Sequence, residues 1–563
     1  MTTDLIIIYR AVIILWILYV PFCIKRLIFR EEYAPKVVPQ QSVEEPQREP
    51  KLNWDQMKPV LLSEEQVFEK LIEKEVRRRV KQAISSKNRK KQQIQQFRVK
   101  KKPGKPLGGK GGGRRIPAFI DHHEVLAYKS CPACGFSFCG KKPRDKYQRF
   151  LLDLVFEKRG KRVIALHYEI WGHYCERCKT LKYPPIDAPP KARLGWGLIT
   201  WTIIKRVARK MAYDAIAAEI LDLCNESISK PTLIRWMKKT AKPLLKIYTH
   251  LWEIAKQSAY MHIDETGAPL NGTNWWLWVL VTKKVVLYHA HASRGHHAIK
   301  DKLAEYVGVI LSDFWGAYNK LPQEQQKCLI HLIRALKEII YDKLKQKKEI
   351  QKKLQRNAFA KEPPPKRASP SPPQKKRGRS KKKVPPLQVE ELVALKTTLG
   401  LLDRVLWNCL LLLFFFQNLI HLHNTAQKLK SGQEEGSSIQ LPSFEEAVSA
   451  LEILIQVIEA EKVQDADLTR ILKRLRKFNA ELFTFLKYEE LPHGNNPAEQ
   501  KVRPFVMQRK VSGTFGSEEG LQDHAIHLSV YETCRLNQID YLQLLQLVFH
   551  EKWDEVFSQF AQL

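Results

Sequence analysis

The sequence predicts a multidomain α/β protein in which a strand-rich core follows two smaller modules and is interrupted by a helical insertion. Three observations support this prediction. Short apolar runs separated by turn residues indicate strands between residues 258 and 344, apolar residues at helical spacing fill most of the remaining sequence, and two Cys-x-x-Cys pairs precede the core. With 563 residues, of which 44% are hydrophobic, the chain is long enough for three or four domains.

The chain is strongly basic. It contains 95 Lys and Arg residues against 59 Asp and Glu, which leaves a formal net charge of +36. Such an excess favours a polyanionic partner, with nucleic acid ahead of a membrane surface. The ten cysteines are few for this length, which argues against a disulfide framework and for a reducing compartment.

Three segments precede the first globular sequence. Residues 1–56 begin with an apolar run at 5–24, which contains too few consecutive uncharged residues to span a bilayer comfortably. We interpret this segment as a spurious upstream extension, with a signal anchor as the alternative that is not favoured. Residues 57–99 carry a sparse apolar stripe typical of a basic helix or short coiled coil, and residues 100–118 form a Lys/Gly/Pro linker.

Residues 119–190 are predicted to form a zinc ribbon. Four cysteines make two knuckles: Cys131, Cys134, Cys175 and Cys178. Four thiolates complete the tetrahedral coordination of Zn²⁺ and leave no position for water, so the site is expected to be structural. Strands are expected at residues 147–155 and 163–171. Two redox-active cysteine pairs are the alternative, which is disfavoured because no thioredoxin-like strand–helix pattern surrounds them.

Residues 191–257 are largely helical by periodicity and have the pattern of a helix-turn-helix. A helix at 214–223 is followed by a turn, and Ser229 with Pro231 begins a second helix. The second helix is expected to bury Leu233, Ile234 and Trp236. Its basic side chains suit the major groove of DNA, and the predicted DNA contacts are Lys230, Arg235 and Lys238. A plain helical hairpin is the alternative.

The strand-rich core begins in residues 258–344. Strands are expected at 260–264, 275–282, 285–292, 309–312 and 327–332, with a helix at 295–306. Asn271-Gly272 is typical of a hairpin turn. Three antiparallel strands, a helix and a further strand make the ribonuclease-H topology, in which the ends of the first and fourth strands lie side by side. Asp264 and Asp313 are expected at those two ends, so their carboxylates should come together.

Paired carboxylates at strand ends predict a magnesium site. Strand alternation directs Asp264 and Glu265 to opposite faces, so Glu265 is not an automatic ligand. Because two carboxylates do not complete a two-metal site, a third is needed, and Glu499 is the best candidate. The alternative role for Glu499 is a capping box with Asn496 at the N-cap and Pro497 at the first helical position.

Ordered motifs continue through the chain and carry a resemblance. They are Asp264-Glu-Thr-Gly, Ser312-Asp313-Phe-Trp-Gly-Ala-Tyr, Cys328-Leu-Ile-His331-Leu-Ile-Arg334 and Asn495-Asn-Pro-Ala-Glu499. The chain is similar in these motifs to the DDE transposases of the insertion-sequence-66 family. The resemblance implies that Asp264, Asp313 and Glu499 bind two Mg²⁺ ions. It further implies phosphate contacts by Arg503, Arg509 and Lys510.

The resemblance also implies an activity and partners. The expected reaction is magnesium-dependent nicking at the 3′ ends of an insertion element, followed by strand transfer into target DNA. Expected partners are the element ends, target DNA, further copies of the chain on paired ends and accessory proteins of the same element. The expected location is the cytoplasm of a prokaryote, at the nucleoid. A catalytically inactive DNA-binding protein derived from a transposase is the alternative.

The insertion is predicted at residues 345–490. Its Lys/Pro-rich part at 355–386 is expected to be disordered, and helices follow. The apolar run at 401–423 includes Asp403, Arg404, Asn408 and Gln417, which favours a buried helix over a membrane span. Residues 491–563 would then supply the second part of the core and C-terminal helices. Pro504 predicts that the helix carrying Glu499 is short or kinked.

Overall fold

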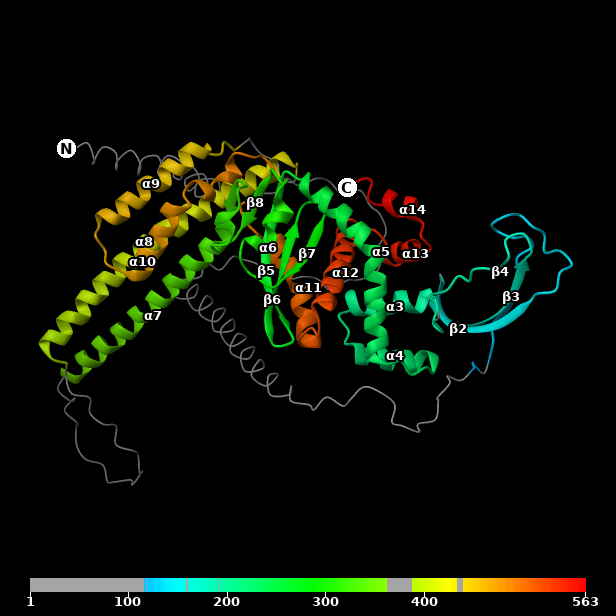
Figure 1. Ribbon diagram of the computed structural model, residues 1–563. Helices are drawn as coiled ribbons and strands as arrows, with labels where there is room; N and C mark the ends of the chain where they lie inside the picture. The colour runs from blue at the N-terminus through cyan, green and yellow to red at the C-terminus, as the bar shows by residue number, and fades with distance from the viewer. Residues whose placement is uncertain (1–115, 118, 158–159, 191, 362–386, 433–438) are drawn as a thin grey trace, which may run out of the picture. The chain divides into compact units, whose positions relative to one another are not determined.

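The computed structural model describes residues 116–117, 119–157, 160–190, 192–361, 387–432 and 439–563 (Figure 1). The expectations for the first 115 residues and for residues 362–386 of the Lys/Pro-rich part lie outside the described residues. The expectation of disorder is wrong for residues 355–361, which form the end of a long helix. The chain divides into two compact units. We call residues 98–328 with 494–563 the core unit, and the remainder that is described, within 329–493, the helical unit.

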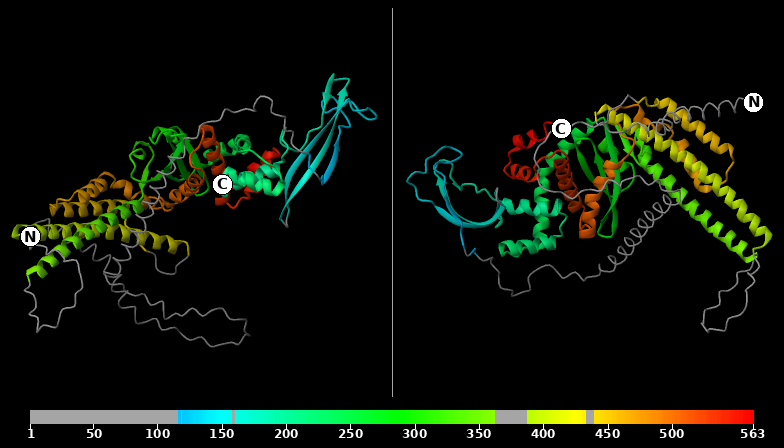
Figure 2. Two further views of the ribbon diagram at one scale, coloured as in Figure 1. Left: turned by 90° about the horizontal axis from the view of Figure 1, so that it is seen from below. Right: turned by 180° about the vertical axis from the view of Figure 1, so that it is seen from behind.

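A four-stranded sheet opens the described part of the core unit. Its strands are β1 (His122–Leu126), β2 (Asp145–Glu157), β3 (Gly160–Cys175) and β4 (Thr180–Lys182). Figure 2 shows β2 and β3 as long paired arrows, and they are antiparallel from the Asp145–Gly172 pair to the Glu157–Gly160 pair. The two strands expected here are confirmed, and each is longer than its apolar run indicated.

Three helices follow the ribbon: α3 (Trp196–Val207), α4 (Tyr213–Cys224) and α5 (Lys230–Lys256). Helix α4 ends where Asn225 adopts a left-handed conformation with φ of 50°, and α5 begins directly after Ser229 as expected. The expectation for Ile234 is wrong, because its side chain is 43% exposed. The buried face of α5 runs through Leu233 and Trp236 instead, and Ile234 lies about 100° round the helix from Leu233.

The second sheet of the core unit has five strands in the order β7-β6-β5-β8-β9. They are β5 (Tyr260–Leu270), β6 (Thr273–Val281), β7 (Val286–His291), β8 (Val309–Ser312) and β9 (Gln325–Lys327). The first three are antiparallel, and β8 and β9 run parallel to β5. Asn271 and Gly272 both have positive φ, 45° and 89°, so the expected hairpin turn joins β5 to β6.

Three expectations for this sheet are corrected. Asp264 does not end its strand, because the pairing of β5 with β6 continues to Leu270. The fifth strand is Gln325–Lys327, and the apolar residues that follow begin a helix with Leu329, Leu332 and Leu336 on its buried face. The expected helix at 295–306 is reduced to α6 (His297–Lys300) and a single 3-10 turn.

The chain returns to the core unit with α11 (Asn496–Ser512), α12 (Glu518–Leu536), α13 (Tyr541–Phe549) and α14 (Trp553–Ser558). Helix α11 continues past Pro504 for two further turns, so of the two expectations for this helix, short or kinked, the first is wrong. Helix α12 covers the edge strand β7. Two side-chain hydroxyls of α12 accept the backbone hydrogen bonds that a neighbouring strand would otherwise accept. Ser529 accepts from the Tyr288 amide at 2.9 Å, and Thr533 accepts from the Val286 amide at 3.0 Å.

The helical unit contains α7 (Leu329–Lys361), α8 (Val389–Lys430), α9 (Phe444–Ala460) and α10 (Ala466–Lys477). Among the described residues, α8 is the helix long and apolar enough to cross a membrane, and 44% of its apolar window is buried inside the protein. Its buried Asn408 donates to Glu461 at 2.9 Å. The core helix of a helical bundle has the same composition, which fits the expected buried helix.

Candidate functional site

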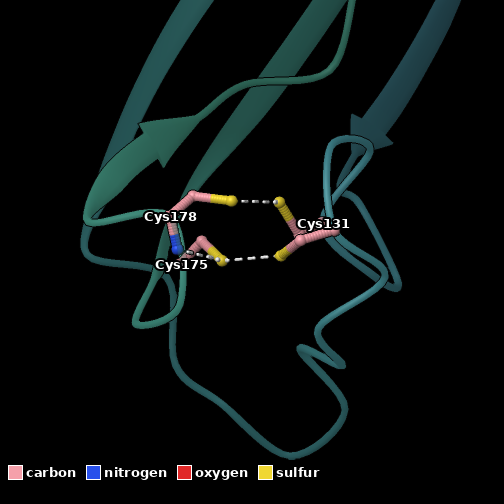
Figure 3. A group of neighbouring side chains, drawn as sticks. Cys131, Cys175 and Cys178 are labelled. Carbon is pink, nitrogen blue, oxygen red and sulfur yellow. Dashed lines mark hydrogen bonds between the residues drawn. The ribbon is translucent and has the colours of Figure 1, made fainter.

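The four cysteines of the ribbon come together at one end of the sheet (Figure 3). Their sulfur atoms all lie within 4.8 Å of one another, with 3.4 Å between Cys134 and Cys175 and 3.9 Å between Cys131 and Cys178. Zn–S bonds of about 2.3 Å in a tetrahedron separate sulfurs by about 3.8 Å, so the spacing fits zinc. The expected four-thiolate set is therefore confirmed as a cluster that can bind this metal.

Local backbone geometry forms the first knuckle. The Gly135 amide donates to the carbonyl of Cys131 at 2.9 Å, and Gly135 has a φ of 73°, which a side chain would disfavour. Burial opposes ionisation of Cys131, but hydrogen bonds from the backbone of Ala133 and Cys134 and from the thiols of Cys175 and Cys134 lower its pKa to about 6. The neighbouring thiols raise the pKa of Cys178 in turn. The backbone thus supports the thiolate form that binds metal.

Asp264 lies on β5, and Asp313 directly follows the neighbouring strand β8 of the five-stranded sheet. Strand β5 pairs in parallel with β8, and the last pair in this register is His262 with Leu311. Asp264 is two residues beyond His262, and Asp313 is two residues beyond Leu311. The two aspartates therefore lie equally far beyond the last pair of this ladder, at the same end of β8.

The start of α11 is attached to β5 by Asn495. The Asn495 amide group donates to the carbonyl of Ile263 at 2.7 Å, and its oxygen lies 3.0 Å from Nδ1 of His262. Because an amide oxygen only accepts, the imidazole donates from Nδ1. Burial lowers the pKa of His262 to about 4, so this imidazole is neutral. Asn495 thus holds the helix that carries Glu499 against the residue preceding Asp264.

The expected capping box is not formed. The N-cap of α11 is Asn495 rather than Asn496, and its side chain makes no cap hydrogen bond. The reason is that the Asn495 amide is used on β5. Glu499 still lies in the first helical turn, as expected. Sequence reasoning quoted Asn495 as the first residue of a motif but gave it no role of its own.

Asp264 is electrostatically coupled to both other carboxylates. Its pKa is raised from 3.8 to about 7, chiefly by burial and then by the neighbouring charges of Glu265, Asp313 and Glu499. Asp264 is thus close enough to Asp313 and to Glu499 for the charge of each to act on it. Within the described residues these three do not form a group as tight as the four cysteines. Magnesium sites use few protein carboxylates and take further ligands from water and phosphate, so a looser arrangement suits this ion.

Glu265 is a further acidic residue at this end of the sheet. Its side chain is 2% exposed and pairs with Arg294 at 2.6 Å. Tyr318 also donates a hydrogen bond to it. Burial raises the pKa of Glu265, and the hydrogen bonds from Tyr318 and Arg294 oppose that rise. Glu265 is therefore compensated by protein groups, which agrees with the expectation that it is not an automatic metal ligand.

A comparison with family models identifies the chain. The model described as Transposase IS66 family matches residues 191–400 and 414–523, which is more than half of the sequence. The chain belongs to this transposase family. The matched residues include Asp264, Asp313 and Glu499, and they begin after the four cysteines. A search of the curated proteins found no match.

The basic residues predicted to contact DNA differ in their surroundings in this transposase-family chain. On α5, Lys230 pairs with Asp214 at 3.3 Å and Lys238 pairs with Glu519, whereas Arg235 is exposed. On α11, Arg503 and Lys510 are exposed. Arg509 donates instead to the carbonyl of Gly267 on β5, which gives it a role in holding α11 to the sheet.

Removing one cysteine of the cluster tests the metal site. In Cys175→Ser we expect the bound zinc to fall from one equivalent to near zero, because three thiolates leave the tetrahedral set incomplete. Zinc content is measured by mass spectrometry on the purified chain. Cys139→Ser is the matched control, since Cys139 is exposed and lies outside the cluster. Equal zinc in both variants would contradict the assignment.

Removing the Asn495 amide tests the attachment of α11. Asn495→Ala leaves the buried His262 Nδ1 and the Ile263 carbonyl without this partner, and we expect a loss of about 1–3 kcal/mol in the free energy of unfolding. Denaturant-induced unfolding measures the change. The exposed neighbour Asn496 supplies the control, and Asn496→Ala should change stability by less than about 0.5 kcal/mol. Similar losses in the two variants would contradict this role.

The raised pKa of Asp264 predicts a pH dependence. Between 3.8 and about 7 the folded state holds a proton that the unfolded state has released, so stability falls as the pH rises through this window. Without added magnesium, Asp264→Asn should reduce that fall by on the order of 1–4 kcal/mol between pH 4 and pH 8. Unfolding free energies at the two pH values measure it. Asp301→Asn is the control, because Asp301 is exposed. If the unfolding free energy changed with pH to the same extent in the wild type, Asp264→Asn and Asp301→Asn, the raised pKa of Asp264 would be refuted.

Proposed function

We propose that this chain is a DNA transposase that binds the ends of its insertion element and catalyses magnesium-dependent 3′-end nicking and strand transfer. One observation carries the proposal: Asp264 and Asp313 each lie two residues beyond the last pair of the β5–β8 ladder, His262 with Leu311. Asn495 supports it by tying the start of the Glu499 helix to β5. The raised pKa of Asp264 supports it independently. Membership of the Transposase IS66 family agrees with it.

We infer that the five-stranded sheet is a ribonuclease-H-like core. The support is its strand order, in which three antiparallel strands are followed by two strands parallel to the first. In such a sheet the acidic residues of β5 and of the loop after β8 face a common end. Helix α11 would bring the third carboxylate to that end from a segment far along the chain.

The carboxylates fit magnesium by their chemistry. All three candidates offer oxygen ligands, which Mg²⁺ prefers, and their mutual repulsion is relieved when a cation is bound. Bound at Asp264, Asp313 and Glu499, the metal would stabilise the attacking and leaving oxygens of an in-line displacement at phosphorus. The backbone amide of Trp315 donates to Oδ1 of Asp313 at 2.8 Å and so orients this carboxylate for its role. Asn495 holds the helix that presents Glu499.

DNA binding is proposed for the basic surfaces outside the carboxylates. The ribbon groups three lysines around a single hollow of about 450 Å³ that also contains Trp171: Lys141, Lys142 and Lys146. Helices α4 and α5 supply the helix-turn-helix candidate with Arg235 exposed, and α11 supplies Arg503 and Lys510. These residues would contact phosphates, whose charge matches the basic excess of the chain. Pairing of two ends by several copies, with accessory proteins, stays a prediction.

The alternative is a catalytically inactive DNA-binding protein derived from a transposase. All three acidic residues are present in this chain, and Asp264 experiences the charge of the other two. This coupling favours the enzyme, because a binding module gains nothing from acidic side chains that are held close to Asp264 and would repel the phosphates.

One substitution separates the enzyme from the binding protein. Asp313→Asn should reduce magnesium-dependent nicking of a duplex that carries the element's terminal repeat to background, because the amide no longer supplies a charged ligand. Zinc content and affinity for the same duplex should stay unchanged. Gel analysis of the nicked strand measures the activity, and the exposed Asp301 gives the control Asp301→Asn. Full nicking by Asp313→Asn would refute the proposed role.

A further inference from the structure

Two tryptophans and an arginine stack beside the carboxylates. Trp276 lies on β6, Arg294 follows β7 and Trp315 follows β8. The Arg294 guanidinium carbon lies 3.8 Å from the ring centre of Trp315 and 4.7 Å from that of Trp276, so it contacts both indoles. We call these three residues the indole–arginine stack. The outer member, Trp315, keeps 40% of its surface exposed although Arg294 covers part of its ring.

The position of Trp315 is tied to that of Asp313. The backbone amide of Trp315 donates to the Asp313 carboxylate at 2.8 Å, and the two residues are separated by Phe314 alone. An exposed indole is therefore held next to a proposed metal ligand. Its attachment to Arg294 reduces the side-chain freedom that binding would otherwise have to remove.

The charge of Arg294 is already compensated inside the protein. Its Nε donates to Glu265 at 2.7 Å, and the terminal nitrogen lies 2.6 Å from the same carboxylate. Glu265 is almost fully buried, with 2% of its side chain exposed. Moving Arg294 to a phosphate would leave this carboxylate buried without its partner, which is strongly unfavourable. The stack is therefore better suited to an uncharged aromatic surface than to a phosphate.

The ligand that fits an exposed aromatic face beside a phosphate-processing site is a nucleobase. Aromatic side chains stack on bases of any sequence, because every base has a π face. In an intact duplex those faces are covered by neighbouring base pairs, so the base must be unpaired to reach Trp315. In the proposed reaction the DNA ends lie beside Asp264 and Asp313, at this part of the core unit.

We propose that Trp315, supported by Arg294 and Trp276, stacks on an unpaired base next to the scissile phosphate of the element end. This inference rests on the proposed function. Stacking would offset the cost of opening the pair, and an opened pair lets the scissile phosphate approach Asp264 and Asp313. Trp315 is then a substrate-positioning residue that acts by holding the end in an unpaired form.

The test compares paired and unpaired ends. The full-length chain is assayed with Mg²⁺ on a duplex carrying the terminal repeat that flanks its gene, either fully paired or with a mismatch at the pair next to the nick. Trp315→Ala should slow nicking of the paired duplex by about 5- to 150-fold, the effect of losing one stacked base. The mismatched duplex should be affected much less, and Trp315→Phe should restore most of the activity on paired DNA.

A binding measurement gives a second readout. 2-Aminopurine at the same position should be quenched when the wild-type chain binds in Ca²⁺, and less quenched with Trp315→Ala. Trp407→Ala is the matched control, because Trp407 is 60% exposed and belongs to the helical unit. This variant should behave as the wild type in both assays.

The outcomes separate this inference from the proposed function. If Trp315→Ala slows nicking of the paired and the mismatched duplex equally, the indole–arginine stack only supports the loop that carries Asp313. If Trp315→Ala leaves nicking unchanged, the stack does not act on DNA. Either result overturns the inference. A wild-type chain that nicks neither duplex contradicts the proposed function instead. The quenching in Ca²⁺ still tests the stack in that case.

Discussion

The side chain of Asn495 joins two parts of the core unit that are 233 residues apart in sequence. The side-chain amide of Asn495 makes hydrogen bonds with His262 and Ile263 on β5. The backbone amide of Asn495 donates to the sulfur of Cys328 at 3.1 Å. Cys328 is where the chain leaves the core unit, and Gly494 is where it returns. The points where the chain leaves and re-enters the core unit are therefore adjacent, so residues 329–493 can be inserted between them without disrupting the five-stranded sheet. Everything that α11 contributes to the site depends on this attachment.

Helix α11 is held from its other side as well. Lys501 pairs with the buried Glu532 of α12 at 2.7 Å, and the hydroxyl of Tyr288 on β7 donates to the Lys501 carbonyl at 2.7 Å. Arg509 adds its bond to Gly267 on β5. A glutamate in the first turn of a helix fixed at several points loses little conformational freedom when it binds a ligand. Such preorganisation is what electrostatic stabilisation of a charged transition state requires.

Local patterns predicted several features correctly. The two Cys-x-x-Cys knuckles, the ribbon strands and the Asn271-Gly272 turn all depend on residues close together in sequence. Errors arose where distant contacts override local preference. Strand β5 continues past Asp264 because β6 supplies partners as far as Leu270, and α11 continues past Pro504 in contact with the sheet. Ile234 was expected to be buried because apolar residues usually are, yet no described element covers it fully.

The sequence by itself determined the chemistry that the chain carries: a four-thiolate cluster, three acidic residues in ordered motifs and the membership of a transposase family. The tertiary structure decided which of these groups meet. Backbone preferences act over a few residues, so they can form a knuckle or a hairpin. They cannot specify that an asparagine amide binds β5, or that Arg294 lies between Trp276 and Trp315 while paired with Glu265. Those contacts arise from packing between distant segments, where burial makes an unsatisfied polar group costly and so selects one arrangement.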